Sequence, residues 1–348
     1  MTSAGGGGGR CAVLGAGSWG TTLALHLAAR GERVALWEVD ADRAAEVART
    51  RFSRPFLPAH ALPPEIAVTA DLSAALAEAS MVVLAVPSHV MRETATRLGA
   101  LGAEQDAGGR LWVSATKGIE EGSGKTARQV LAEAGGLAAR SIVVLAGPSF
   151  AADVVARRPT AVLAASETAQ GAERVQARFS CEWFRVYTNP DPLGVEIGVS
   201  LKNVMAIAAG LAEGLALGRN AFGALITRGL AEVTRLGVRM GGRWETFLGL
   251  AGVGDLVMTC TSELSRNYRV GLALARGKRL AHILDELQMV AEGVRTCRSA
   301  YELSERLAVE MPITRQVHAV LFEEQDPREA VLDLMRRPLK PESWGVGR

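Results

Sequence analysis

Hydrophobic residues are arranged differently in the two halves of the chain. Up to about residue 190, short runs of β-branched residues alternate with alanine-rich stretches of helical pattern. The runs predict buried strands at 11–14, 33–37, 81–86, 111–114 and 141–145, and the stretches predict helices at 21–29, 41–49, 72–78 and 126–134. This alternation is typical of a parallel sheet with helices on both faces.

The second half has almost no strand pattern. After the turn-rich Thr188-Asn-Pro-Asp-Pro192, helices are predicted at 195–212, 222–236, 267–276, 297–307, 313–323 and 328–337. Asp326 and Pro327 suit the first two positions of the last helix. We therefore expect an α/β fold, in which a Rossmann-type doubly wound parallel sheet (11–192) precedes an all-helical substrate domain (193–338). Residues 1–10 and 339–348 would be tails, and the cleft between the domains is the expected ligand site.

Composition narrows the class of protein. A chain of 348 residues with 48% hydrophobic and 22% charged residues suits two globular domains, and a net charge of +2 argues against broad nucleic-acid binding. The N-terminus carries five consecutive glycines, and no apolar run approaches the ~20 residues of a membrane helix. The scattered cysteines predict free thiols in a reducing cytoplasm and no metal site: Cys11, Cys181, Cys260 and Cys297.

A glycine-rich loop, Gly15-Ala-Gly17-Ser-Trp-Gly20, follows the first predicted strand and opens the first helix. In this context the three glycines permit a tight turn, a close approach of a dinucleotide pyrophosphate, and close packing of helix on strand. The second strand ends at Glu38, about where an acidic residue would bind the adenine ribose. An exposed loop carboxylate is an equally good interpretation of Glu38 at this point.

Lysine is rare in this chain, which has 39 basic residues but only five lysines. Lys117 follows the end of a predicted strand, where ligands bind in open α/β sheets. Lys202 lies in a largely apolar helix. There it is either a snorkelling side chain or a functional amine of lowered pKa, and the scarcity of lysine favours function.

Two further segments have candidate chemistry. The glycine-rich bend that begins at Gly249 ends in the carboxylate of Asp255. Ten residues later, Ser265, Arg266 and Asn267 stand at a probable helix start. A serine cap, free backbone donors and an arginine can form a phosphate receptor, although an ordinary cap beside a solvated arginine is the commoner arrangement.

In their order along the chain, these segments resemble the bacterial NAD(P)-dependent glycerol-3-phosphate dehydrogenase family. The resemblance runs from Val13 to about Pro312 and includes Val86-Pro-Ser-His89, Thr116-Lys-Gly-Ile-Glu120, Gly147-Pro-Ser-Phe150, Leu201-Lys-Asn203 and Val290-Ala-Glu-Gly-Val-Arg-Thr296. Single pieces are weak evidence, but their ordered conjunction is specific. It implies interconversion of glycerol 3-phosphate and dihydroxyacetone phosphate for phospholipid synthesis, by a cytoplasmic enzyme that is usually a dimer.

The resemblance also implies roles for individual residues. Lys202 would be the general acid/base. Substrate would be bound by Lys117, Gly147, Ser149, Lys202, Asp255, Ser265, Arg266 and Asn267. The cofactor, NAD or NADP, would be bound by Gly15, Gly17, Ser18, Trp19, Gly20, Glu38, Lys117, Ala151, Arg266, Val290 and Glu292.

The chain departs from the family pattern in two places. Glu38 and Val39 replace a small residue followed by an arginine, and this favours use of NADH, although Arg43 could compensate. Val199 and Ser200 replace a small pair before Leu201, with an effect expected on packing more than on chemistry. Two alternatives stay open: a related dehydrogenase of hydroxy acids, which would not need the phosphate receptor, and a catalytically silent cofactor-binding regulator.

Overall fold

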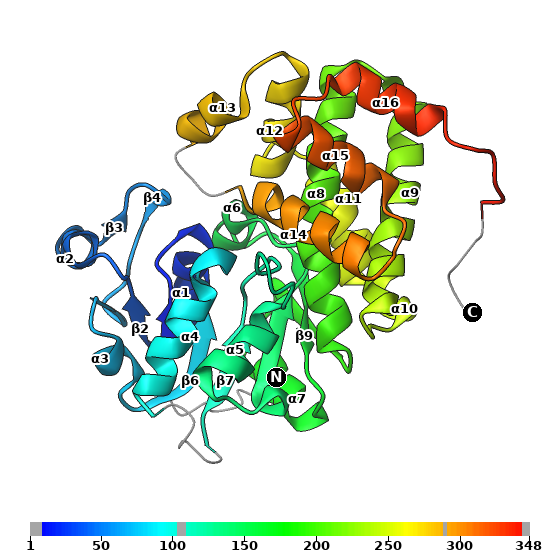
Figure 1. Ribbon diagram of the computed structural model, residues 1–348. Helices are drawn as coiled ribbons and strands as arrows, with labels where there is room; N and C mark the ends of the chain where they lie inside the picture. Colours follow the sequence, from blue (N-terminus) through cyan, green and yellow to red (C-terminus); the bar gives the residue numbers. More distant parts are fainter. Residues whose placement is uncertain (1–8, 103–108, 288–290, 343–348) are drawn as a thin grey trace.

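One large sheet forms the centre of the first half of the chain. The computed structural model describes residues 9–102, 109–287 and 291–342. Within them, eight strands are ordered β10-β9-β8-β7-β6-β1-β2-β5 (Figure 1). Their bounds are β1 Arg10–Leu14, β2 Arg33–Trp37, β5 Ile66–Thr69, β6 Ala79–Leu84, β7 Leu111–Ser114, β8 Ile142–Ala146, β9 Thr160–Ala165 and β10 Phe184–Asn189. All neighbours pair in parallel except β8 and β9, which are antiparallel.

Helices cover both faces of this sheet. Successive strand residues point to opposite faces, and both sets are apolar, so each face needs a covering layer. In β1, Cys11 and Val13 belong to one hydrophobic core, whereas Ala12 and Leu14 belong to another. The covering helices are α1 Ser18–Ala29, α2 Ala41–Thr50, α3 Leu72–Leu76, α4 Met91–Ala100, α5 Ala127–Gly135, α6 Ala151–Val155 and α7 Ala169–Phe179. A small hairpin, β3 Phe52–Ser53 and β4 Leu57–Ala61, follows α2. The predicted Rossmann-type sheet is confirmed.

The order of the strands reverses between β1 and β6. The chain runs from β1 outward through β2, and later returns to the other side of β1 with β6. The loops after β1 and β6 therefore diverge at this point, which is where α/β sheets bind their ligands. The glycine-rich loop at Gly15 and the segment at Val86 both begin here.

The second half of the described chain is helical and lies above the sheet in Figure 1. Its long helix α8 (Pro192–Gly214) is followed by α9 Gly218–Arg239, α10 Trp244–Phe247, α11 Asp255–Cys260, α12 Arg266–Ala275, α13 Leu280–Leu287, α14 Glu292–Arg306, α15 Pro312–Phe322 and α16 Pro327–Met335. A single π-helical turn, Leu250–Gly254, precedes α11. Asp326 caps α16 by accepting from the N–H groups of Arg328 and Glu329, as predicted.

Several boundaries differ from those predicted. The helix expected at 72–78 ends at Leu76, because Ala77 leaves the helical conformation and Glu78 adopts a positive φ of 56°. Strand β6 therefore begins at Ala79 instead of 81. The helix expected at 297–307 begins at Glu292. The elements that were not predicted are strands β3, β4, β5, β9 and β10 and helices α4, α6, α7, α10, α11 and α13. The division of the chain at residue 192 stays a prediction.

Helix α8 is the core of the helical half. The expectation that no apolar run approaches the length of a membrane helix is wrong, because by length and composition α8 is apolar enough to cross a membrane; 89% of its most apolar window is, however, buried inside the protein. Asp191 caps it through the N–H of Gly194, and the same carboxylate accepts from the Arg243 N–H and the Thr246 hydroxyl. Burial on all sides is the property of a central helix in a globular bundle.

Candidate active site

The glycine-rich loop has the geometry expected for a dinucleotide. Gly15 has a φ of +107°, and a Cβ on it would lie 2.9 Å from the Ala85 carbonyl oxygen. A Cβ on Gly20 would collide with the Gly15 carbonyl, whereas one on Gly17 would meet nothing within 4 Å. Gly17 is also the N-cap of α1 and provides no side-chain cap. The first N–H groups of α1 thus point into open space beside Gly17, where a pyrophosphate can approach.

Glu38 does not lie free at the end of β2. It is only 3% exposed, accepts from the Asp40 N–H at 3.1 Å, and forms an ion pair with Arg43 whose atoms are 2.5 Å apart. Arg43 also lies over the Phe56 ring. The carboxylate and the guanidinium are therefore neutralised by each other, and the interpretation of Glu38 as an exposed loop carboxylate is wrong.

Lys202 lies at the junction of the two domains, and four side chains meet there. Its Nζ is 2.5 Å from Asp255 Oδ1 and 2.7 Å from Thr259 Oγ1. Lys117 Nζ is 3.2 Å from Asp255 Oδ2 and also donates to the Gly147 carbonyl at 3.2 Å. One carboxylate thus holds two amines from different domains, and Lys202 and Asp255 are almost completely buried.

Burial dominates the acid–base behaviour of this group. It lowers the pKa of Lys202 from 10.5 to about 7; the positive charge of Lys117 acts in the same direction, and Asp255 opposes both. A buried ammonium loses its hydration, so the neutral amine becomes competitive at neutral pH. An amine of this kind can both donate and accept a proton under physiological conditions.

The backbone explains how Asp255 reaches Lys202. The π-helical turn before α11 contains Gly252, where a Cβ would collide with the Phe247 carbonyl. Gly198 of α8 likewise leaves room for the Ala251 carbonyl, 2.5 Å from where its Cβ would be. Glycine on both elements lets this turn pack directly on α8, and this brings the carboxylate at the start of α11 onto the lysine.

A second cluster is formed where α12 and α14 begin. Ser265 caps α12 through the Tyr268 N–H, and Asn267 Oδ1 accepts from the Gly293 N–H at 2.9 Å. Glu292 accepts from the hydroxyl of Ser88 at 2.6 Å and from its N–H at 3.2 Å. Arg266 lies close to Glu292: burial lowers the pKa of Arg266, and Glu292 opposes this effect. A half-buried guanidinium therefore stands beside free helix N–H groups.

The two clusters are adjacent. Gly118 follows Lys117, and a Cβ on it would lie 2.6 Å from Ser88 and 3.2 Å from Glu292 Oε2. Asn203 follows Lys202, and its carbonyl lies 2.7 Å from where a Gly293 Cβ would be. The lysine pair therefore lies beside the starts of α12 and α14.

The remaining predicted residues lie next to Gly147 or at the starts of α1 and α6, with one exception. Ser149 donates to the Gly147 carbonyl at 3.0 Å, and Ala151 is the first residue of α6. Ser18 begins α1, and the Trp19 indole Nε1 is buried without a hydrogen bond in the described structure. Val290 lies outside the described residues.

Two residues at the site, Thr259 and Ser88, were not singled out from the sequence, and a third, Ser200, was expected to act mainly on packing. Thr259 is one turn after Asp255 on α11, so its proximity to Lys202 follows from that of Asp255. Ser88 lies within the Val86-Pro-Ser-His89 segment, which carried no separate chemical signal. Ser200 Oγ accepts a hydrogen bond from the Gly118 N–H, so its effect is not confined to packing.

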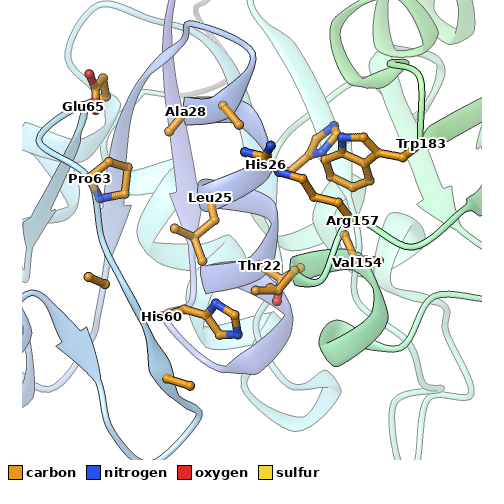
Figure 2. A pocket seen from close by; sticks show the side chains of 14 residues that line it. Thr22, Leu25, His26, Ala28, His60, Pro63, Glu65, Val154, Arg157 and Trp183 are labelled. Atoms are coloured by element: carbon orange, nitrogen blue, oxygen red, sulfur yellow. The ribbon is translucent and has the colours of Figure 1, made fainter.

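A separate surface hollow lies between α1, β4 and α6 (Figure 2). His26, His60, Arg157 and Trp183 are among its lining residues, and none of the predicted site residues lines it. The aromatic packing of His26 against Phe184, Trp183 and Phe179 accounts for its burial there. The hollow is therefore distinct from the lysine site.

Comparisons with known proteins agree with this geometry. The models described as NAD-dependent glycerol-3-phosphate dehydrogenase N-terminus and C-terminus match residues 10–172 and 191–332. A glycerol-3-phosphate dehydrogenase (NAD(P)+) of Geobacter sulfurreducens is 50% identical over 336 residues, which are 96% of this chain and 99% of the relative. One of Thermoanaerobacter sp. is 45% identical over 97% of this chain and its own full length.

Solved structures give the same result. Glycerol-3-phosphate dehydrogenase from Coxiella burnetii superimposes with a TM-score of 0.89 at 40% identity, covering 95% of this chain and 99% of its own. D-Mandelate dehydrogenase with NADH, at 10% identity and a TM-score of 0.56 over 91% of this chain and 99% of its own, shares the fold alone. The chain therefore belongs to the NAD-dependent glycerol-3-phosphate dehydrogenase family.

Proposed function

We propose that Lys202 is the general acid/base with which this NAD(P)-dependent enzyme interconverts sn-glycerol 3-phosphate and dihydroxyacetone phosphate. The observation that carries the proposal is the buried Nζ of Lys202, held by Asp255 and Thr259 with a pKa of about 7. Ketone reduction needs a proton at the carbonyl oxygen, and the reverse reaction needs a base at the hydroxyl. An amine that titrates near neutral pH serves both directions.

The remaining groups bind and orient. The nicotinamide, when bound, supplies or accepts the hydride. Asp255 and Thr259 fix the Lys202 side chain, and Lys117 adds a positive charge beside the substrate oxygen. Gly17 and the uncapped start of α1 suit the pyrophosphate of the cofactor. The proposed cofactor contacts are Gly15, Gly17, Ser18, Trp19, Gly20, Glu38, Lys117, Ala151, Arg266, Val290 and Glu292.

We assign the substrate phosphate to the start of α12. Because Asn267 Oδ1 is engaged by Gly293, its amide nitrogen is left to donate. Arg266 contributes a positive charge, and the backbone of a capped helix start adds N–H donors. With Lys117, Gly147 and Ser149 on the opposite side, the phosphate anchor would hold the reacting carbon close to Lys202.

The Glu38–Arg43 pair leads us to propose that NADH is used at least as well as NADPH. Arg43 is already neutralised by Glu38, so it has little free charge to offer a 2′-phosphate. Initial rates with both cofactors at saturating dihydroxyacetone phosphate test this point. A clearly higher kcat/KM with NADPH would contradict it.

We further propose a cytoplasmic homodimer that supplies glycerol 3-phosphate to phospholipid synthesis. Trp244, the first residue of α10, and Leu248, which follows the last, are 49% and 58% exposed, and exposed large apolar side chains are common at protein–protein interfaces. Analytical ultracentrifugation tests the dimer. A monomer at micromolar concentration would contradict it.

The central test of this function replaces the lysine. Lys202→Ala should abolish turnover of dihydroxyacetone phosphate while NADH binding, measured by fluorescence titration, stays near normal. Lys202→Arg should fail as well, because a guanidinium stays protonated and cannot exchange a proton at neutral pH. Substantial activity of the arginine variant would remove Lys202 from the acid/base role.

A further inference from the structure

The backbone that carries Lys117 is attached directly to the helix that carries Lys202. Gly118, the next residue after Lys117, donates its N–H to Ser200 Oγ at 2.9 Å. Ser200 lies on α8, two residues before Lys202. The two proposed active-site lysines come from different domains, and this bond joins their backbones within a few residues of each.

The Ser200 hydroxyl both donates and accepts a hydrogen bond. It is 1% exposed and donates its own hydrogen to the Glu196 carbonyl at 2.6 Å. Its lone pairs are therefore left to accept, and the Gly118 N–H uses them. An alanine at this position would leave the Gly118 N–H in a buried environment without this acceptor, and such groups are rarely tolerated without movement.

On the side away from α8, Gly118 is packed closely against Ser88 and Glu292. Its φ is +137°, and the space where a Cβ would stand is filled by Ser88 at 2.6 Å and by Glu292 Oε2 at 3.2 Å. The segment is thus packed against the Ser88–Glu292 contact on one side and tied to α8 on the other. When the tie to α8 is removed, the segment can relax away from α8, and Lys117 moves with it.

We propose that Ser200 is a positioning residue: through the Gly118 N–H it sets the separation of Lys117 and Lys202, and so the pH range in which the site transfers protons. The effect on catalysis rests on the proposed function of Lys202, whereas the effect on the separation does not. Alanine at this position would keep the helix and lose the tie, because alanine is the better helix former.

The sign of the effect follows from the charges around Lys202. In the described residues the charged groups that act on Lys202 are Asp255 on α11 and Lys117 across the junction. Cys260 on α11 is a nearby titratable group, but its thiol is neutral because burial raises its pKa. Lys117 and Lys202 bind opposite oxygens of Asp255, so their positive charges lie a few ångströms apart. With an effective dielectric constant of about 20, each ångström of added separation near ~5 Å raises the pKa of Lys202 by about 0.4 unit.

The experiment compares Ser200→Ala with Ser299→Ala. Ser299 Oγ donates to the Ile119 carbonyl at 3.1 Å, so this control removes a buried hydroxyl hydrogen bond from the next residue of the same segment, but from α14. Both variants would be labelled with lysine carrying ¹³C at Cε and titrated by NMR. The chain has only five lysines, at positions 117, 125, 202, 278 and 340, and loss of one signal in Lys202→Arg assigns Lys202.

We expect Ser200→Ala to raise the pKa of Lys202 by about 0.4 unit or more, and Ser299→Ala to leave it unchanged within about 0.1 unit. The pH profile of kcat/KM for ketone reduction should move to higher pH by the same amount in Ser200→Ala. An unchanged Lys202 signal, or an equal shift in both variants, would overturn the positioning role.

The same titration separates this inference from the proposed function. If the Lys202 signal moves in Ser200→Ala while the kcat/KM profile does not follow it, Ser200 positions the lysine but Lys202 is not the acid/base. If the profile of the unmodified enzyme follows Lys202 but Ser200→Ala changes neither, the acid/base role stands and the positioning role fails.

Discussion

The phosphate assignment makes a quantitative prediction at Arg266. Replacing Arg266 with alanine removes the half-buried guanidinium beside Glu292 and leaves the Ser265 cap and the α12 backbone in place. A charge-assisted hydrogen bond to a phosphate in such a setting is worth about 2–3 kcal/mol, so kcat/KM for dihydroxyacetone phosphate should fall roughly 30–150-fold. Dihydroxyacetone without its phosphate should be a poor substrate already and should lose little more.

The assay is NADH consumption at saturating cofactor, with NADH affinity measured in parallel because Arg266 is also a proposed cofactor contact. Arg269→Ala is the matched control: it removes the same charge one turn away, from an exposed position of the same helix. It should change kcat/KM for the phosphorylated substrate by less than about threefold. Equal losses for both substrates in Arg266→Ala, or equal losses in both variants, would refute the assignment.

Two further predictions concern the first domain. Gly20→Ala should lower both the melting temperature and the NADH affinity, because its Cβ would collide with the Gly15 carbonyl, whereas Gly17→Ala, whose Cβ would have open space, should lower the NADH affinity alone. Thermal melts and NADH titrations of the two variants check this, and similar melting temperatures would contradict it. Burial lowers the pKa of His26 from 6.5 to about 4, so its contribution to stability is fully present above pH 6.5 and is lost as pH falls from 6.5 to about 4. The free energy of unfolding should therefore fall by up to about 3 kcal/mol more between pH 7 and 4 in the unmodified protein than in His26→Phe; urea titrations with equal pH dependence in both would rule this out.

The features that the sequence predicted well are encoded in short stretches of neighbouring residues. The glycine-rich loop was recognisable from its spacing directly after a strand, and the structure shows a positive φ of +107° at Gly15 and no room for a Cβ at Gly20 beside the Gly15 carbonyl. Lys202 was singled out because lysine is rare in this chain and this one interrupts an apolar helix. Both features can be recognised without knowledge of the tertiary fold.

What it missed depends on contacts between distant segments. Asp255 and Lys202 were both named from the sequence, but their ion pair spans 53 residues and was not predicted, because the π-helical turn that makes it possible has no clear periodic pattern. Ser200 was assigned to packing because its partner, the Gly118 N–H, lies 82 residues away in the other domain. The alanine-rich strand β9 carries few of the β-branched residues on which strand prediction relies, and its antiparallel pairing with β8 is decided by the fold.

The most direct test of the account is the pH dependence of kcat/KM in both directions of the reaction. If Lys202 transfers the proton, ketone reduction requires its protonated form and should decline as pH rises through about 7, whereas alcohol oxidation requires the neutral amine and should rise through the same range. Mirror-image profiles centred near pH 7 are the predicted result. Profiles that titrate near the ordinary lysine value of about 10, or that show no opposed limbs, would contradict it.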